Sequence, residues 1–283
     1  MCKRILHNFL TNRSKIFFHL PIFFLFLPAI CYSISFAEGI NSQAAVIMDA
    51  STGEILYGKN SDYLLQPAST AKLMTAIIVI EKANLSDIVT ISPKAAQAHP
   101  YKAGLKKGDK LTIEGLLFAA LLRSANDAAV ALAEAVAGSE ESFVSLMNEK
   151  AALIGAVNTK FINATGLPGI GQYITALDLS RIMKCAMSYP KLREILATPS
   201  AEVSTERGKA IFLRNTDKLL WSDEQVIGGK TGYTNSAKHC FVFAAERDGK
   251  TIIVSLLGSP SRKNLWKEAK KLADKGFQMI AAR

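Results

Sequence analysis

Histidine is scarce in this 283-residue sequence, which contains only four. Two of them, His99 and His239, lie beyond the first 37 residues, and no Gly-x-Ser-x-Gly segment is present. A hydrolase built on Ser, His and Asp is therefore disfavoured, because it needs a histidine base and often carries its serine on that turn. No His, Cys and Asp residues stand at metal-ligand spacing, so the sequence predicts neither a metal site nor a cofactor.

Cysteine is also rare, and two of the four cysteines fall within the first 37 residues. The remaining pair, Cys185 and Cys240, has the option of a disulfide if the protein is exported. A single candidate pair is a weak signal in a chain with ample core, so we expect free, buried thiols.

Acidic residues are absent from residues 1–37. This segment starts with basic side chains, continues with an apolar run over residues 16–30, and ends with small residues up to Ala37. The pattern predicts a signal peptide over residues 1–37 and an exported domain over residues 38–283. The alternative is an uncleaved anchor, because the apolar run nearly spans a bilayer. We expect the protein in the periplasm or on the outer face of the cytoplasmic membrane, associated with the membrane only through an uncleaved leader or peripheral contact.

Without residues 1–37 the chain keeps 30 basic and 24 acidic residues, a net charge of +6. A mildly basic domain of this size is compatible with an anionic polymer, but it has no nucleic-acid footprint, so no nucleic-acid partner is expected. Hydrophobic residues make up 49% of the sequence, which is enough for a large core and excludes wholesale disorder.

Patterns typical of strands occur at both ends of the exported part, and patterns typical of helices fill its middle. The expected strands cover residues 44–49, 54–57, 201–204, 211–214, 230–233, 240–245 and 251–257, and the expected helices cover residues 69–83, 113–123, 127–137, 141–154, 175–188 and 261–282. This order differs from a βαβα alternation. It predicts an α+β fold in which one antiparallel sheet, formed from both chain ends, packs on helices and carries a mostly helical middle subdomain. The final helix is expected to pack on the sheet rather than on a membrane.

Ser69-Thr-Ala-Lys72 places a hydroxyl and an amine three residues apart in the first expected helix. That spacing puts both side chains on one helix face. The helix body is apolar on every side, so burial is expected to lower the pKa of Lys72 and leave a neutral amine that accepts the serine proton. Ser69 is expected to stand at the cap, where the helix dipole favours negative charge.

The same spacing occurs by chance at Ser188-Tyr-Pro-Lys191. Pro190 disfavours a continuous helix there, so those two side chains need not align. For Ser69 itself, the alternative interpretation is an ordinary helix cap beside a solvated lysine. The motif alone therefore does not establish a reaction.

Two further short motifs follow along the chain. Ser124-Ala-Asn126 separates two expected helices, where a hydroxyl and an amide can project into a cleft or simply form a turn. Lys230-Thr-Gly232 lies on an expected strand, where a lysine beside a hydroxyl suits a carboxylate and Gly232 lets a ligand approach the backbone. The alternative for this third motif is an edge strand protected by a lysine.

Together the three motifs resemble the set that marks penicillin-binding proteins and class A β-lactamases. With the neighbouring segments 66–75, 122–127, 163–167 and 229–234, the sequence resembles the low-molecular-mass penicillin-binding proteins, specifically the serine D-alanyl-D-alanine carboxypeptidases. The resemblance covers essentially all of residues 38–283 and implies the β-lactamase/transpeptidase-like fold.

By this resemblance, Ser69 attacks the carbonyl between the two terminal D-alanines of a peptidoglycan stem pentapeptide. Lys72 resembles the general base, and Ser124 resembles the group that relays a proton to the leaving D-alanine. The implied substrate-binding residues are Asn126, Lys230, Thr231, Gly232 and Tyr233. Lys230 and Thr231 would hold the terminal carboxylate, and the N–H groups of Ser69 and Tyr233 would form the oxyanion hole. Water then hydrolyses the acyl-serine, and β-lactams are implied as slowly released covalent inhibitors.

The sequence departs from the family pattern in two places. Only about 50 residues follow Lys230, which leaves no room for the second all-β domain and amphipathic anchor of larger members. Lys238 stands where the family usually has a glycine, beside the strand that carries the third motif.

Three alternative functions remain open. A D,D-endopeptidase that cuts peptidoglycan cross-links uses the same acyl chemistry, and motifs do not separate the two. A β-lactamase is disfavoured because no Glu-x-x-Leu-Asn segment lies between Ser124 and Lys230. A non-catalytic peptidoglycan-binding protein is disfavoured by the intact serine and both lysines.

Overall fold

The computed structural model describes residues 39–283, so the expected signal peptide lies outside the described residues. A five-stranded antiparallel sheet with the order β2-β1-β9-β8-β7 joins the two ends of this range. Its strands are β1 (Ala44–Asp49), β2 (Ile55–Lys59), β7 (Val226–Thr234), β8 (Lys238–Arg247) and β9 (Lys250–Ser259). The prediction of one sheet built from both chain ends is confirmed, because β1 pairs with β9.

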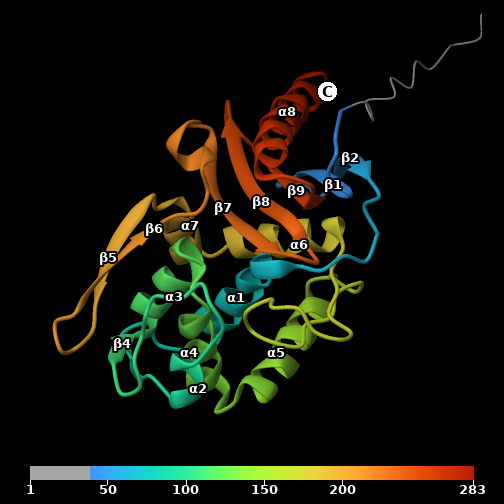
Figure 1. Cartoon of the computed structure of the whole chain (residues 1–283). Coiled ribbons are helices and arrows are strands. Elements are labelled where there is room, and N and C mark those ends of the chain that lie inside the picture. Colours follow the sequence, from blue (N-terminus) through green and yellow to red (C-terminus); the bar gives the residue numbers. More distant parts are fainter. Residues whose placement is uncertain (1–38) are drawn as a thin grey trace, which may run out of the picture. The chain divides into compact units, whose positions relative to one another are not determined.

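Side chains alternate between the two faces of this sheet, and each face has its own core. Val46 and Val242 belong to the core shared with the middle of the chain, whereas Ile47 and Phe243 pack against α8 (Arg262–Ala281). Figure 1 shows α8, in red, along one face of the sheet. Its buried residues recur at helical spacing, so the expectation that this helix packs on the sheet is confirmed.

The middle of the chain is mainly helical. α1 (Lys72–Lys82) is buried along its first eight residues, and α6 (Ala176–Met187) packs between it and the sheet. The other helices of this part are α2 (Pro93–Ala96), α3 (Ile113–Leu122), α4 (Asn126–Ala137), α5 (Glu140–Leu153) and α7 (Pro190–Ala197). No helix within residues 39–283 combines the length and apolar character that a membrane crossing requires.

The structure differs from the sequence-based expectations outside the main sheet. β5 (Ser200–Ser204) and β6 (Ala210–Arg214) exist as strands, but they pair only with each other and form a separate hairpin. A second small pair, β3 (Ile88–Thr90) with β4 (Lys110–Thr112), lies in a region expected to be helical. The helix α7 is also unexpected from the sequence, because Pro190 begins it rather than breaking it.

Glu268 connects the start of the described chain to α8. This carboxylate is 2% exposed, and it accepts the backbone N–H groups of Asn41 (2.6 Å) and Ser42 (3.1 Å) together with the Ser42 hydroxyl. One side chain thus satisfies three donors that precede β1. Its loss would leave buried polar groups unpaired, which costs more than the net value of the bonds themselves.

Replacing Glu268 with alanine should therefore lower the free energy of unfolding by about 2–3 kcal/mol, the range for buried donors that lose a charged partner. Urea denaturation followed by circular dichroism measures this. The matched control is Lys263→Ala on the exposed face of the same helix, for which a change within about 0.5 kcal/mol is expected. Equal losses in both variants would contradict the proposed link.

Candidate active site

Ser69 lies just before α1, but it is not a helix cap. It belongs to a short 3-10 helix, η1 (Ala68–Ala71), and α1 begins only at Lys72. Neither helix has a side-chain cap at its start, so the expectation for Ser69 is wrong in this respect. The tighter 3-10 turn leaves the Ser69 side chain half-buried and free of a capping bond.

Lys72 is fully buried, and its Nζ lies 3.0 Å from Ser69 Oγ. The same Nζ donates to Asn126 Oδ1 at 2.7 Å and to the Thr165 carbonyl at 2.8 Å. None of these three partners is a carboxylate. Burial, and to a smaller extent the charge of Lys230, hold the pKa of Lys72 well below its ordinary value of 10.5. The surroundings therefore favour the neutral amine.

Asn126 begins α4 and is held in place from two directions. Its Nδ2 donates to the Pro100 carbonyl at 2.9 Å, which directs its Oδ1 toward Lys72. The next residue, Asp127, accepts the backbone N–H groups of Ala103 (2.9 Å) and Leu105 (3.0 Å). The start of α4 thus fixes both the amide and the loop that faces it.

The second and third motifs meet at Ser124 and Lys230. Ser124 lies on the turn between α3 and α4 with φ of 63°, a left-handed conformation that is uncommon for a residue other than glycine. Lys230 in β7 is 1% exposed and donates to Ser124 Oγ at 3.0 Å and to the Thr231 carbonyl at 3.0 Å. Burial lowers the pKa of Lys230 to about 7, and the Asp217 carboxylate opposes that effect.

Strand β7 passes close to η1 at Gly232. A Cβ at this position would lie 2.9 Å from Ser69 N and 3.1 Å from Thr70 N. The glycine is therefore required by the backbone of η1 itself, and not only by an approaching ligand. Beside it, Tyr233 is 42% exposed, and its ring lies 4.5 Å from the His239 ring, centroid to centroid.

Two hollows meet at Ser69. The first, about 320 Å³, is lined by Ser69, Tyr101, Arg123, Ser124, Thr216, Thr231, Gly232, Tyr233, His239, Arg262, Leu265 and Trp266. The second, about 440 Å³, is lined by Ser69, His99, Pro100, Tyr101, Asn126, Gly166, Leu167, Pro168, Tyr233, Thr234, Asn235 and Ser236. All the residues singled out from the sequence line one of these hollows, except the two buried lysines. Lys72 and Lys230 reach the site through their bonds to Ser69 and Ser124.

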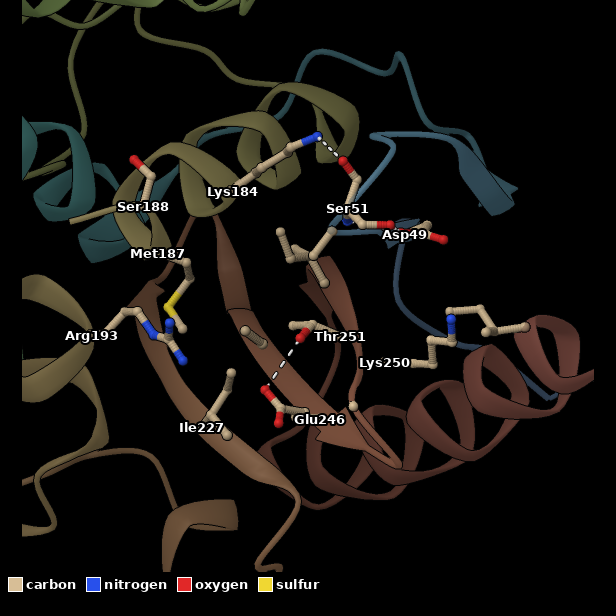
Figure 2. A pocket seen from close by; sticks show the side chains of 15 residues that line it. Asp49, Ser51, Lys184, Met187, Ser188, Arg193, Ile227, Glu246, Lys250 and Thr251 are labelled. Atoms are coloured by element: carbon tan, nitrogen blue, oxygen red, sulfur yellow. Dashed lines mark hydrogen bonds between the residues drawn. The ribbon is translucent and has the colours of Figure 1, made fainter. Parts of the chain in front are cut away.

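A third hollow, of about 420 Å³, lies elsewhere in the fold (Figure 2). The β8–β9 hairpin, the C-terminal part of α6 and the turn after β1 line it, with Lys184, Arg193 and Glu246 on its walls. Ser188, the serine of the chance match Ser188-Tyr-Pro-Lys191, also lines this hollow. Its hydroxyl donates a hydrogen bond to the Cys185 carbonyl. Lys191 instead pairs with Glu114 and Glu194. The geometry is therefore consistent with the interpretation of Ser188-Tyr-Pro-Lys191 as a chance match.

Several residues at the site carry no motif signal in the sequence. Thr165 contributes only its backbone carbonyl, and Thr216 accepts a 2.7 Å hydrogen bond from the Thr231 hydroxyl. Arg123 and Arg262 add positive charge to the first hollow. Thr165 and Arg123 fall in segments that the family resemblance involves, whereas Thr216 and Arg262 do not.

The structure accounts for Lys238 and describes the state of the two cysteines. Lys238, which replaces the usual glycine, is exposed with φ of 58°, so the backbone keeps the left-handed conformation that glycine favours. Within residues 39–283 the cysteines are unpaired: Cys240 is buried and Cys185 is half-buried.

The chain is similar to known proteins in sequence and in fold. The family described as D-alanyl-D-alanine carboxypeptidase matches residues 33–261. The D-alanyl-D-alanine carboxypeptidase DacF of Bacillus subtilis is 34% identical over 241 residues, covering 83% of this chain and 62% of its own length. A D-alanyl-D-alanine endopeptidase of Pseudomonas aeruginosa is 32% identical over 212 residues, covering 72% of this chain and 67% of its own length. The crystal structure of a D-alanyl-D-alanine carboxypeptidase from Mycobacterium tuberculosis superposes with a TM-score of 0.80 at 34% identity, over 84% of this chain and 91% of that one.

Replacing Gly232 with alanine should push β7 away from η1, because the new Cβ would collide with backbone atoms that cannot rotate aside. We expect the rate of Ser69 acylation by a small ester to fall at least about 100-fold, the scale for losing one well-placed backbone donor. Mass spectrometry of the intact protein measures the rate. Gly58→Ala is the control, since its Cβ would make ordinary contacts at 3.6 Å. An unchanged rate for Gly232→Ala would show that this close approach is not needed.

Proposed function

The chain belongs to the D-alanyl-D-alanine carboxypeptidase family of serine peptidases, and we propose that it removes the terminal D-alanine from peptidoglycan stem pentapeptides through an acyl-serine intermediate. The chain spans 62% of the length of the Bacillus subtilis relative, so the activity rests on the site itself. The observation that supports it most directly is the buried Lys72 amine, 3.0 Å from Ser69 Oγ and without an acidic partner. A neutral amine at this distance can act as general base.

In the proposed reaction, Ser69 Oγ bonds to the carbonyl carbon of the penultimate D-alanine while Lys72 Nζ takes the hydroxyl proton. The tetrahedral oxyanion accepts hydrogen bonds from the N–H groups of Ser69 and Tyr233. The bond to the terminal D-alanine then breaks, and its amine receives a proton through Ser124. Water adds to the acyl-serine, releases the shortened peptide and returns the proton to Ser69.

Recognition of the substrate carboxylate is assigned to the first hollow. Thr231 lines it, and Lys230 donates a hydrogen bond to Ser124, which also lines it. Arg123 and Arg262 on its walls supply further positive charge, which favours an anion. Asn126, which lines the second hollow, would contact the peptide while it orients Lys72. Gly232 completes the set by bringing β7 against Ser69.

We further propose that residues 1–37 act as a signal peptide and that residues 38–283 form the catalytic domain, exported to the periplasm or the outer face of the cytoplasmic membrane. The expected partners are peptidoglycan stem peptides, with β-lactams as covalent inhibitors that mimic the acyl donor. Cleavage of cross-links between stem peptides is the second candidate activity, favoured by the endopeptidase relative. A β-lactamase has less support because no Glu-x-x-Leu-Asn segment lies between Ser124 and Lys230. A non-catalytic binding protein has less support because the serine and both lysines are intact.

Labelled penicillin tests the nucleophile. We expect Ser69→Ala to lose all label that survives denaturation, because no acyl-serine can form, while its circular dichroism spectrum stays the same. The matched control is Ser188→Ala, which removes the serine of the chance match Ser188-Tyr-Pro-Lys191. This variant should label normally. Retention of label by Ser69→Ala would contradict the assignment, and absence of label from the unmodified protein would favour a non-catalytic role.

Two substrates separate the candidate activities. Incubation with a monomeric pentapeptide should release free D-alanine, whereas incubation with a cross-linked dimer should leave most of the dimer intact. Chromatography of the products with mass detection measures both. Faster conversion of the dimer to monomer would make the protein an endopeptidase, with the same acyl chemistry at Ser69.

A further inference from the structure

Tyr101 is an exposed aromatic residue that has no role in the proposed reaction. It is 70% exposed, and its φ of 71° is a left-handed conformation that is uncommon for a residue other than glycine. A ring left in water forgoes the free energy that its burial would contribute, and the left-handed φ adds a conformational cost. Both features are unfavourable in the free protein, so the surrounding structure must hold the residue in place.

Hydrogen bonds to the start of α4 hold the backbone on both sides of this ring. The Tyr101 carbonyl accepts the Asn126 N–H at 2.8 Å, and the Pro100 carbonyl accepts Asn126 Nδ2 at 2.9 Å. Further along the chain, the Asp127 carboxylate accepts the N–H groups of residues 103–105 at distances of 2.9, 3.0 and 3.0 Å. The strained conformation of Tyr101 therefore persists because its surroundings determine it, as is typical of functional positions.

The β5–β6 hairpin supports the same segment from a second direction. Lys209, in the turn between the two strands, donates to the Gly104 carbonyl at 2.7 Å. The Glu206 N–H of the same turn donates to the Lys110 carbonyl at 2.9 Å, and its carboxylate lies 3.3 Å from Lys110 Nζ. The hairpin thus steadies the segment that follows Tyr101.

Tyr101 stands where the two hollows at Ser69 meet. These hollows have three lining residues in common, which are Ser69, Tyr101 and Tyr233. Tyr233 is itself 42% exposed, and it follows Gly232, which packs against Ser69 N. In the proposed reaction the leaving D-alanine occupies the first hollow and the rest of the peptide occupies the second. The scissile bond then lies over Ser69, and the two aromatic residues border it.

We propose that Tyr101 is a substrate-contacting residue whose ring packs, together with Tyr233, on the peptide at the scissile bond. This inference rests on the proposed function. The penultimate D-alanine presents a methyl group and a planar amide at this point, and aromatic rings offer a large, rigid surface for such groups. Binding buries the ring that is exposed in the free protein. It also excludes water from the oxyanion hole, whose hydrogen bonds are stronger in a dry site.

Two truncations separate the ring from the backbone strain. Tyr101→Ala removes the ring and keeps the unfavourable φ, whereas Tyr101→Gly removes the ring and relieves the strain. Both should lower kcat/KM for D-alanine release from a pentapeptide by at least about 10-fold, the lower end for one apolar contact in a substrate site. The melting temperature should be higher in Tyr101→Gly than in Tyr101→Ala. Tyr101→Phe keeps the ring and should keep kcat/KM.

Asp248→Gly is the matched control, because Asp248 is also exposed with a left-handed φ of 51° but lines neither hollow at Ser69. Its kcat/KM should equal that of the unmodified protein. Unchanged kcat/KM in both truncations would overturn the proposal, and so would an equal loss in Tyr101→Phe. A loss confined to Tyr101→Gly would also overturn it, because loop mobility rather than the ring would then be the cause.

Nitration by tetranitromethane tests the contact without any substitution. Tyr101 should react in the free protein, as should Tyr63, which is 60% exposed and lines neither hollow at Ser69. After penicillin has acylated Ser69, nitration of Tyr101 should slow several-fold while that of Tyr63 stays the same, as measured by mass spectrometry of peptides from one sample. Equal nitration of Tyr101 before and after acylation would overturn the proposal. If the unmodified protein neither releases D-alanine nor takes up penicillin, the proposed function itself fails.

Discussion

The site depends on one buried amine. A neutral lysine has two N–H donors and one lone pair, and Lys72 has three neighbours that match this set. Asn126 Oδ1 and the Thr165 carbonyl can only accept, so they take the two N–H groups. Ser69 Oγ can donate, so the lone pair is left for its proton. An ammonium would also find three acceptors here, but full burial with no carboxylate among its hydrogen-bond partners opposes that charge.

Gathering those neighbours constrains the backbone on both sides of η1. Gly166, with φ of 79°, packs so tightly that a Cβ there would lie 1.8 Å from the Ala68 carbonyl oxygen. Gly232 packs on the opposite flank, against Ser69 N. Ala68 itself adopts φ of 47°, an uncommon conformation for alanine. The 3-10 turn that carries the serine is therefore held between a loop and a strand, and the strain at Ala68 is compensated by these contacts.

The sequence predicts the parts of this site that depend on short-range spacing or alternation. Three residues of separation on one chain bring Ser69 and Lys72 together, and alternation defines the faces of β1, β8 and β9. The sequence does not predict a contribution that comes from a backbone carbonyl, such as that of Thr165. The prediction that Ser69 caps a helix is wrong, because Ser69 lies within the 3-10 helix η1 and the α-helix begins only at Lys72. The hairpin of β5 and β6 was assigned to the main sheet because strand patterns do not specify a partner.

The two buried lysines influence each other within one site, because the positive charge of Lys230 is one of the causes that lower the pKa of Lys72. Both lysines donate their hydrogen bonds only to neutral acceptors, and a carboxylate opposes the effect of burial on each pKa, Asp127 for Lys72 and Asp217 for Lys230. A substrate carboxylate that binds beside Lys230 would offset part of the positive charge that lowers the pKa of Lys72. Lys72 would then become a stronger base once the substrate is bound, at the stage when it must take the serine proton. Recognition of the anion and activation of the nucleophile are in this way coupled by Coulomb interactions alone, without any movement of the chain.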